Sequence, residues 1–280
     1  MLRPSLRVLD PRDLEEALVL CARDVVANLF VAARLRETGV DGGGQLWGFY
    51  EGSQLTSLCW WGANLVPVEA TPAAVDAFAA RARRIGRRCS SIVGPAEPVL
   101  ALWRQLSGTW ARPREVRSVQ PLMALSGPPA VPADPAVRRG RPEELDLIVP
   151  ACVSMFTEEV GYSPVAVDGG AAYVAQVTGL VTQQRSFVRV EQGEHGPEIV
   201  FKAELGSVTP EAVQVQGVWV NPAHRGRGLA APAMAALVEQ VRASVAPTVS
   251  LYVNDFNHRA VRVYERVGFA RVGTYATVLF

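Results

Sequence analysis

The sequence predicts an α/β protein built from two consecutive halves, each with a mixed sheet and flanking helices, and three observations support this. Four prolines within residues 126–135 interrupt the chain near its middle, because proline lacks an amide donor and restricts the residue before it. Both halves begin with a short strand, a proline and an acidic helix start. Both continue with alternating strand-like and helix-like patterns. We therefore expect domains over residues 1–126 and 137–280, joined by a proline-rich linker over 127–136.

The composition excludes several classes of protein. The 28 basic and 27 acidic side chains leave a formal charge of +1, which provides no electrostatic footprint for nucleic acid. The four cysteines are widely spaced, so we expect reduced core thiols and no metal site. No apolar stretch approaches the ~18 residues that a membrane span needs. These features favour a cytoplasmic protein that has no contact with membranes.

The first half is expected to alternate strands and helices after its opening strand. A helix should run from about residue 14 to 38, with a break near Asp24, and a glycine linker follows it. The remaining elements should be strands at 46–51 and 55–66, a helix at 72–85, a strand at 91–93, a helix at 98–106 and a strand at 116–125.

The second half is expected to place its chemistry in its last ninety or so residues. Two helices, at 143–159 and 170–178, should precede strands at 186–192, 198–207 and 211–220 and then alternating helices and strands. Period-two alternation in the third strand predicts one face with Gln214, Gln216, Val218 and Val220, and another with Val213, Val215 and Trp219.

A glycine loop follows that strand and precedes a helix. It reads Arg225, Gly226, Arg227, Gly228, Leu229 and Ala230. Glycines let the backbone approach a ligand closely, and the first amides of a helix attract anions, so this order suits a pyrophosphate. The loop has no Gly-Lys-Ser/Thr ending, which a nucleotide-triphosphate loop requires, and no three-glycine dinucleotide fingerprint. An ordinary tight strand-to-helix turn is the structural alternative.

A second segment sharpens the prediction. After a strand at 248–253, Asn257 is a competent helix N-cap and Gly268 a competent C-terminal stop. Between them Ala260, Val261 and Tyr264 share one helix face with Asn257. The small side chain of Ala260 leaves room for a ligand chain beside Tyr264.

These two segments resemble the GNAT superfamily of N-acyltransferases. The first matches its Gln/Arg-x-x-Gly-x-Gly/Ala pattern at Arg225, Gly228 and Ala230. The second matches its Asn-x-x-Ala-x-x-x-Tyr-x-x-x-Gly-Phe pattern from Asn257 to Phe269. The resemblance implies two GNAT-like domains in tandem, each with a mostly antiparallel twisted sheet. The first looks like a degenerate copy without a glycine loop, and such chains resemble a group found in high-GC actinobacteria.

The resemblance also implies roles for individual residues. Acetyl-CoA would be the cosubstrate, with its pantetheine arm on the backbone of Val218, Trp219 and Val220 and its pyrophosphate on the glycine loop. Asn254, Asn257 and Ala260 would line the coenzyme site, and Tyr264 would protonate the departing thiolate. The acceptor would be an amine of a small molecule or a protein, no metal would take part, and the oligomeric state is left open.

The proton acceptor is the weakest part of this prediction. The position where several relatives carry a glutamate holds Gln214, whose amide cannot accept a proton. Glu204 is our candidate base, with Glu158 and Glu159 as substitutes, although the alternative of a solvated surface carboxylate is favoured for each. His224 is expected to touch phosphate or solvent. The acceptor groove should be bordered by the loop 161–169 and the hairpin 192–197, which carry Tyr162, Asp168, Glu194 and His195. The competing hypothesis is an acyl-CoA-binding regulatory or partner-docking module without turnover.

Overall fold

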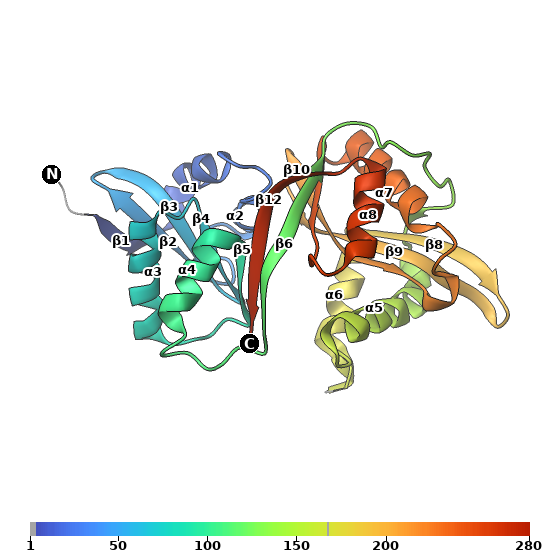
Figure 1. The fold of residues 1–280 in the computed structure, drawn as a ribbon, viewed down its shortest axis with the longest axis horizontal. Coiled ribbons are helices and arrows are strands. Elements are labelled where there is room, and N and C mark those ends of the chain that lie inside the picture. The colour runs from blue at the N-terminus through green and yellow to red at the C-terminus, as the bar shows by residue number, and fades with distance from the viewer. Residues whose placement is uncertain (1–3, 167) are drawn as a thin grey trace. The chain divides into compact units, whose positions relative to one another are not determined.

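A computed structural model describes residues 4–166 and 168–280. Residues 1–3 of the expected first domain and Val167 of the expected acceptor-side loop lie outside the described residues. The fold is α/β with mixed sheets flanked by helices, which confirms the predicted class (Figure 1). Among the described helices, none is long and apolar enough to cross a membrane. All four cysteines are buried and free, as expected.

The chain forms two compact units that are not contiguous in sequence. The first comprises Met1–Ala124, Tyr252–His258 and Arg271–Phe280. The second comprises Leu125–Leu251 and Arg259–Ala270. These units are not contiguous, whereas the proline-rich segment led us to expect two contiguous domains. The division of the chain into domains over 1–126 and 137–280 stays a prediction.

The first unit has a sheet in the order β1-β2-β3-β4-β5-β12-β6. Four of its neighbouring pairs are antiparallel, and β4 and β5 are parallel but pair only at Asn64–Ser91 and Leu65–Ile92. Its strands are β1 (Ser5–Val8), β2 (Gln45–Glu51), β3 (Gln54–Trp61), β4 (Asn64–Val68), β5 (Ser91–Pro95), β6 (Glu115–Leu125) and β12 (Ala270–Leu279).

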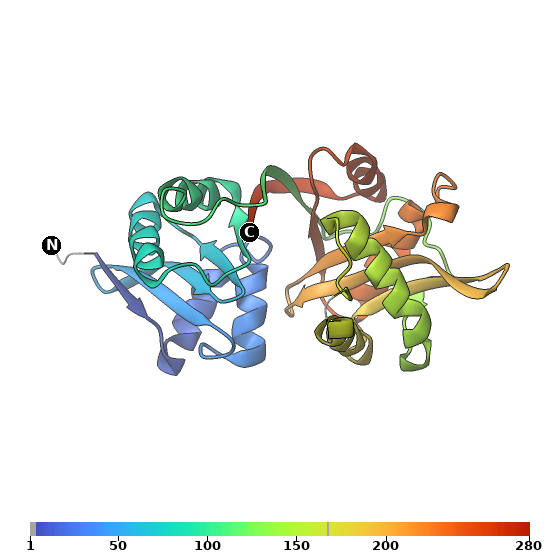
Figure 2. The same cartoon turned by 90° about the horizontal axis from the view of Figure 1, so that it is seen from below.

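Helices cover both faces of this sheet (Figure 2). One core lies under α1 (Leu14–Cys21) and α2 (Leu29–Thr38), and the other lies under α3 (Pro72–Ile85) and α4 (Ala96–Leu106). The predicted break near Asp24 is confirmed, because the Asp24 carboxylate accepts hydrogen bonds from the amides of Val26 and Ala27 between α1 and α2.

Two strand predictions differ from the structure in this unit. The single strand expected over 55–66 is wrong, because the chain turns at Gly62 and Ala63 and returns as β4 antiparallel to β3. The C-terminal strand β12 belongs to the first unit, where it pairs with β5 from Tyr275 to Leu279. The sequence analysis placed this strand in the domain expected over 137–280, but strand partners far apart in sequence leave no local signal.

The second unit repeats the same strand order. The sheet runs β7-β8-β9-β10-β11, with three antiparallel pairs followed by the parallel pair β10 and β11. Its strands are β7 (Arg138–Arg139), β8 (Ser186–Gly193), β9 (Gly196–Val208), β10 (Ala212–Val220) and β11 (Thr248–Tyr252). The helices α5 (Leu145–Val160) and α6 (Ala171–Thr182) pack on one face. On the opposite side lie α7 (Ala230–Ser244) and α8 (His258–Val267) (Figure 1).

Candidate active site

The strands β10 and β11 part after a short parallel ladder. They pair from Ala212–Thr248 to Gln214–Ser250, and the described residues continue the ladder no further. The part of β10 from Val215 to Val220 therefore turns an open backbone edge toward β11. Such an edge can form hydrogen bonds with an extended ligand.

The glycine loop, Arg225–Ala230, lies between β10 and α7. Gly226 and Gly228 adopt φ angles of +80° and +77°, which residues with side chains rarely adopt. Within the described chain the amides of Gly226, Arg227 and Gly228 donate no hydrogen bond, and α7 begins without a side-chain cap. The free amides at a helix N-terminus make an arrangement that attracts anions.

The carboxylate of Glu158, at the end of α5, joins β10 to the glycine loop. Its Oε2 accepts a hydrogen bond from Arg225 at 2.6 Å, and its Oε1 accepts one from the indole of Trp219 at 3.1 Å. Burial alone would raise the pKa of Glu158, but these two hydrogen bonds outweigh burial and lower it. Both oxygens of Glu158 are therefore occupied within the protein, and the side chain of Trp219 is engaged as well.

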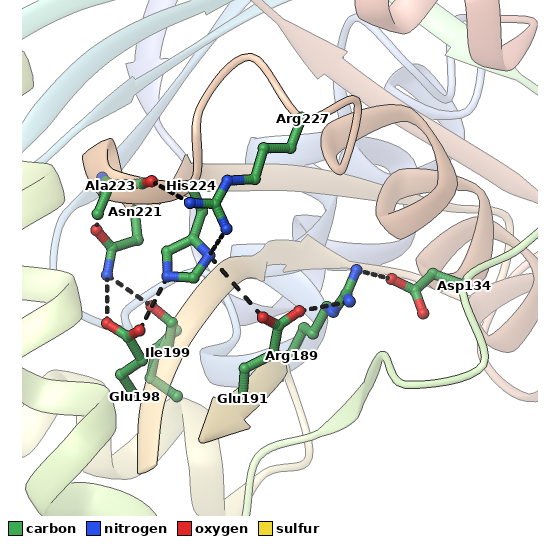
Figure 3. Close-up of polar contacts among 9 residues, drawn as sticks. All are labelled: Asp134, Arg189, Glu191, Glu198, Ile199, Asn221, Ala223, His224 and Arg227. Atoms are coloured by element: carbon green, nitrogen blue, oxygen red, sulfur yellow. Dashed lines mark hydrogen bonds and ion pairs between the residues drawn. The ribbon is translucent and has the colours of Figure 1, made fainter. Parts of the chain in front are cut away.

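Arg227 is held by its own turn through His224 (Figure 3). It donates to the Ala223 carbonyl at 3.2 Å, and its Nη1 lies 3.4 Å from His224 Nδ1. His224 Nε2 lies 2.9 Å from Glu198 Oε1. The network therefore assigns the histidine proton to Nε2. The expectation that His224 touches solvent is wrong, because its ring is buried and lies between Glu198 and Arg227; its contact with phosphate stays a prediction.

The network continues into the proline-rich segment. Asn221 donates to Glu198, and its own side-chain oxygen caps the turn by accepting from the Ala223 amide. On the other side, Glu191 pairs with Arg189, which in turn pairs with Asp134 at 2.6 Å (Figure 3). The expected linker is thus anchored to β8 and is not a loose tether.

A bulge in β10 changes which side chains share a face. The register with β9 shifts between Gln216 and Trp219, where Gly217 adopts a φ of +58°. Gln216 then pairs with Glu204 and Trp219 with Lys202, so both lie on the same face of the sheet. The predicted face of Trp219 is wrong, because period-two counting fails across an extra residue.

A buried charged cluster lies beneath this bulge. Lys202 Nζ lies 2.6 Å from Glu204 Oε1, and the Cys152 thiol donates to the same oxygen at 3.2 Å. Lys202 is fully buried and Glu204 is 5% exposed, so the alternative of a solvated surface carboxylate at position 204 is wrong. Sequence analysis missed Lys202 and Cys152 as site residues, although Lys202 is the only lysine in the chain, which was a usable signal.

Tyr264 lies on α8 in the same compact unit as the glycine loop and Glu204. It is 7% exposed and packs edge-on against Phe269. Burial, with a smaller contribution from Glu159, raises the pKa of the phenol well above its ordinary value, so it stays protonated. Among the described residues, no hydrogen bond of its hydroxyl contributes to this shift.

The remaining predicted coenzyme residues divide between the units. Ala260 belongs to the second unit, whereas Asn254 and Asn257 belong to the first. The Asn254 side chain accepts a hydrogen bond from Gln120 at 2.9 Å, and Gln120 also accepts one from Thr277. Asn257 precedes α8, as a helix N-cap must.

Sequence comparison identifies the two parts of the chain differently. Residues 172–269 match the acetyltransferase (GNAT) family. Residues 44–148 match a domain of unknown function (DUF4081). No curated protein matches the chain in sequence.

Solved structures resemble the chain over nearly its whole length. A GNAT-family acetyltransferase from Colwellia psychrerythraea is 13% identical, covers 99% of both chains and has a TM-score of 0.59. A GCN5-related N-acetyltransferase from Sphaerobacter thermophilus is 17% identical over 98% of this chain and 94% of its own, with a TM-score of 0.59. A tandem GNAT protein from the clavulanic acid biosynthesis pathway is 14% identical over 99% and 98%, with a TM-score of 0.58.

The chain has the fold of a tandem GNAT protein, and the match of residues 172–269 to the acetyltransferase family supports an acyltransferase. Residues 172–269 lie in an acetyltransferase domain of the GNAT family.

Proposed function

We propose that this protein transfers an acetyl group from acetyl-CoA to a primary amine by direct attack on the thioester. The observation that carries the proposal is the uncapped glycine loop, whose free amides follow a strand that has parted from its neighbour. Pyrophosphate on the loop and pantetheine along the open edge of β10 would use both features. The small residue Ala230 at the start of α7 permits close approach of the phosphates.

The coenzyme half of the proposed site combines backbone and side-chain groups. The backbone of Val218, Trp219 and Val220 would bind pantetheine, and Arg225 and Arg227 would add positive charge beside the amides of the glycine loop. Leu229 holds the N-cap position of α7. Ala260 completes the set of coenzyme contacts that we propose in the second unit.

The proposed chemistry needs an acid, an electrophilic contact and a base. A backbone amide between Val218 and Val220 would polarise the thioester carbonyl. The Tyr264 hydroxyl, held protonated by burial, would protonate the leaving thiolate. Glu204 would take a proton from the ammonium form of the acceptor, because Gln214 cannot and Glu158 is held by Arg225 and Trp219.

We propose one coenzyme site per chain. In the first unit the start of α3 is closed, because the Thr71 side chain accepts a hydrogen bond from the Ala74 amide and Pro72 lacks a donor. Glu69, which precedes this helix, adds a carboxylate that accepts a hydrogen bond from Asn28. A pyrophosphate there would face a capped helix and a nearby negative charge.

Incubation of the protein with labelled acetyl-CoA and a panel of amines tests the proposal. The panel contains phenylethylamine, spermidine, glucosamine and a peptide with free α- and lysine amines, and calorimetry measures coenzyme A binding in parallel. We expect one coenzyme A per chain and label transfer to at least one amine. Binding without any transfer would favour the competing function, an acyl-CoA-binding module, and two bound coenzyme A molecules would contradict a single site.

A further inference from the structure

The one lysine of the chain is fully buried beneath the β10 bulge. The chain has 28 basic residues, and all the others are arginine. Lysine is among the residues least often buried, since removing an ammonium from water is unfavourable unless a partner compensates. A buried Lys202 at this place therefore calls for an explanation beyond composition.

Lys202 and Cys152 both lie close to one oxygen of Glu204. The ammonium lies 2.6 Å from Oε1 and the thiol donates to the same atom at 3.2 Å. The other oxygen, Oε2, receives no hydrogen bond from the described residues, and it would lie 3.1 Å from a Cβ placed on Gly217. The carboxylate is thus fixed on one side and turns its free oxygen to the bulge.

The bulge keeps this position clear of side chains. A Cβ on Gly217 would also meet Lys202 Nζ at 3.2 Å and Met155 Cε at 3.3 Å, in addition to the strain of its positive φ. Only glycine brings the β10 backbone directly onto the ion pair. In the proposed reaction this backbone contacts the thioester, so the free oxygen of Glu204 lies next to the reacting groups.

We infer that Lys202 is a positioning residue of this reaction: its ion pair with Oε1 holds the Glu204 carboxylate so that Oε2 can accept the proton of the incoming ammonium. The inference rests on the proposed function and adds to it the group that fixes the base. Glu204 is the catalytic residue, because it would touch the substrate, whereas Lys202 acts through Glu204.

The thiol and the phenol near Glu204 stay neutral. Burial raises the pKa of the Cys152 thiol to about 12. Burial also raises the pKa of Tyr173, whose hydroxyl donates to the Cys152 carbonyl, well above its ordinary value. For Lys202 burial lowers the pKa, but Glu204 and Cys152 outweigh it and the net shift is upward. Glu159 contributes negative charge near Tyr173 from the end of α5. Lys202 is therefore the positive charge that faces Glu204.

The proton balance of the step is closed. The ammonium of the acceptor gives its proton to Glu204, and the free amine attacks the thioester carbon, forming the C–N bond. Collapse breaks the C–S bond, the thiolate takes a proton from Tyr264, and the tyrosinate recovers one from the nitrogen. Glu204 releases its proton to water, so that one proton is produced per amide formed.

The test replaces Lys202 with methionine, which keeps the length of the side chain and removes its charge. Loss of the ammonium disfavours the ionised carboxylate, so the acidic limb of the pH dependence of kcat/KM should move to higher pH by at least about one unit. The titration of Glu204, followed by NMR of ¹³C-labelled glutamate and assigned with Glu204→Gln, should move in the same direction. Coenzyme A affinity should stay within about twofold of the original, because Lys202 lies outside the coenzyme contacts.

The matched control is Cys152→Ala, which removes a neutral donor from the same oxygen and should produce a smaller shift. The double variant Lys202→Met/Glu204→Gln keeps the fold testable if the single variant unfolds, because it leaves no buried charge without a partner. It should match Glu204→Gln in activity if Lys202 acts only through Glu204. Rescue of the original pH profile by Lys202→Arg would support the charge as the cause.

The outcomes separate this inference from the proposed function. Turnover with an unshifted profile in Lys202→Met, or a double variant clearly less active than Glu204→Gln, overturns the inference and leaves acetyl transfer standing. Absence of turnover with every amine of the panel overturns both the function and the proton-accepting role. An NMR titration of Glu204 that is the same in both proteins overturns the electrostatic link by itself.

Discussion

Arg225 and Glu158 form an ion pair with 2.6 Å between nitrogen and oxygen, although they lie 67 residues apart in the chain. Both side chains are about two-fifths exposed, at 39% and 42%, so the pair contributes little to folding. Its importance lies in its position, because it holds a negative charge against an arginine of the proposed pyrophosphate site.

Replacing Glu158 with glutamine should therefore tighten coenzyme A binding. The amide still accepts the hydrogen bond of Trp219 but no longer opposes the phosphates, and a gain of roughly two- to fivefold matches the energy of an exposed ion pair. Calorimetry at low and high salt measures the effect, which salt should reduce. Glu143→Gln, at an exposed carboxylate of the same unit, is the control. Weaker binding in Glu158→Gln would mean that the ion pair preorganises Arg225 for the ligand.

Gly228 provides the sharpest test of the glycine loop. Gly228→Glu places a carboxylate beside the pyrophosphate and should weaken coenzyme A binding on the order of 100-fold, since like charges in contact repel by several kcal/mol. Gly228→Ala carries only the strain of a φ of +77° and should have a smaller effect. Gly52→Ala, with a φ of +65° in a hairpin turn, introduces similar strain away from the site. Unchanged affinity in Gly228→Glu would remove the loop from the site.

Tyr264→Phe should separate binding from chemistry. Loss of the hydroxyl should lower kcat by roughly 100-fold or more with little change in coenzyme A affinity, because a general acid acts in the transition state. Since burial raises the pKa of Tyr264, the original enzyme should show no loss of kcat from its ionisation up to about pH 10, the ordinary value of a phenol. Tyr275→Phe removes a structural hydrogen bond to the Ala27 carbonyl and should lower stability alone. Equal effects of the two substitutions on kcat would refute the acid role.

Local patterns predicted most elements of the fold. The helix over Pro72–Ile85, the broken helix around Asp24 and the strand–loop–helix order at Gly228 follow from caps, apolar spacing and glycine, which act within a few residues. The prediction of a single strand over 55–66 was wrong because the turn at Gly62 lies inside a continuous apolar run. The partner of β12 could not be predicted, because strand pairing is decided by contacts far apart in the chain.

The site divides in the same way. The place of the glycine loop before α7 and of Tyr264 on α8 could be predicted, because both lie in motifs of fixed spacing. The surroundings of Glu204 could not be predicted, because they depend on Lys202, two residues away on the same strand, and on Cys152 of a distant helix. The bulge at Gly217 also hid the shared face of Gln216 and Trp219, since a single extra residue reverses the alternation of a strand.

The buried thiols predict a loss of stability at alkaline pH. Burial raises the pKa of Cys89 to about 11 and those of Cys21 and Cys152 to about 12, whereas the unfolded chain titrates near 8.5. The contribution of these protonated thiols to the free energy of unfolding is fully present below about pH 8.5. It is lost as pH rises toward the pKa values of the folded state, because only the unfolded state then releases protons. The midpoint temperature of thermal unfolding should decrease as pH rises from about 8.5 to 11. The thiols of the native protein should react slowly with a thiol reagent at pH 8. A midpoint that rises over this interval would contradict the assignment.

His224 should matter for coenzyme binding through the position of Arg227. It lies between Glu198 and Arg227, so His224→Ala removes one of the two acceptors that hold the arginine and leaves Glu198 without its ring partner. We expect coenzyme A affinity to fall by roughly three- to tenfold, the range of one or two net hydrogen bonds, and the thermal midpoint to fall with it. His195→Ala, at an exposed residue of the β8–β9 turn, should change neither. A variant that loses stability but binds coenzyme A normally would show that Arg227 keeps its position through the Ala223 carbonyl alone, or that this arginine does not contact the ligand.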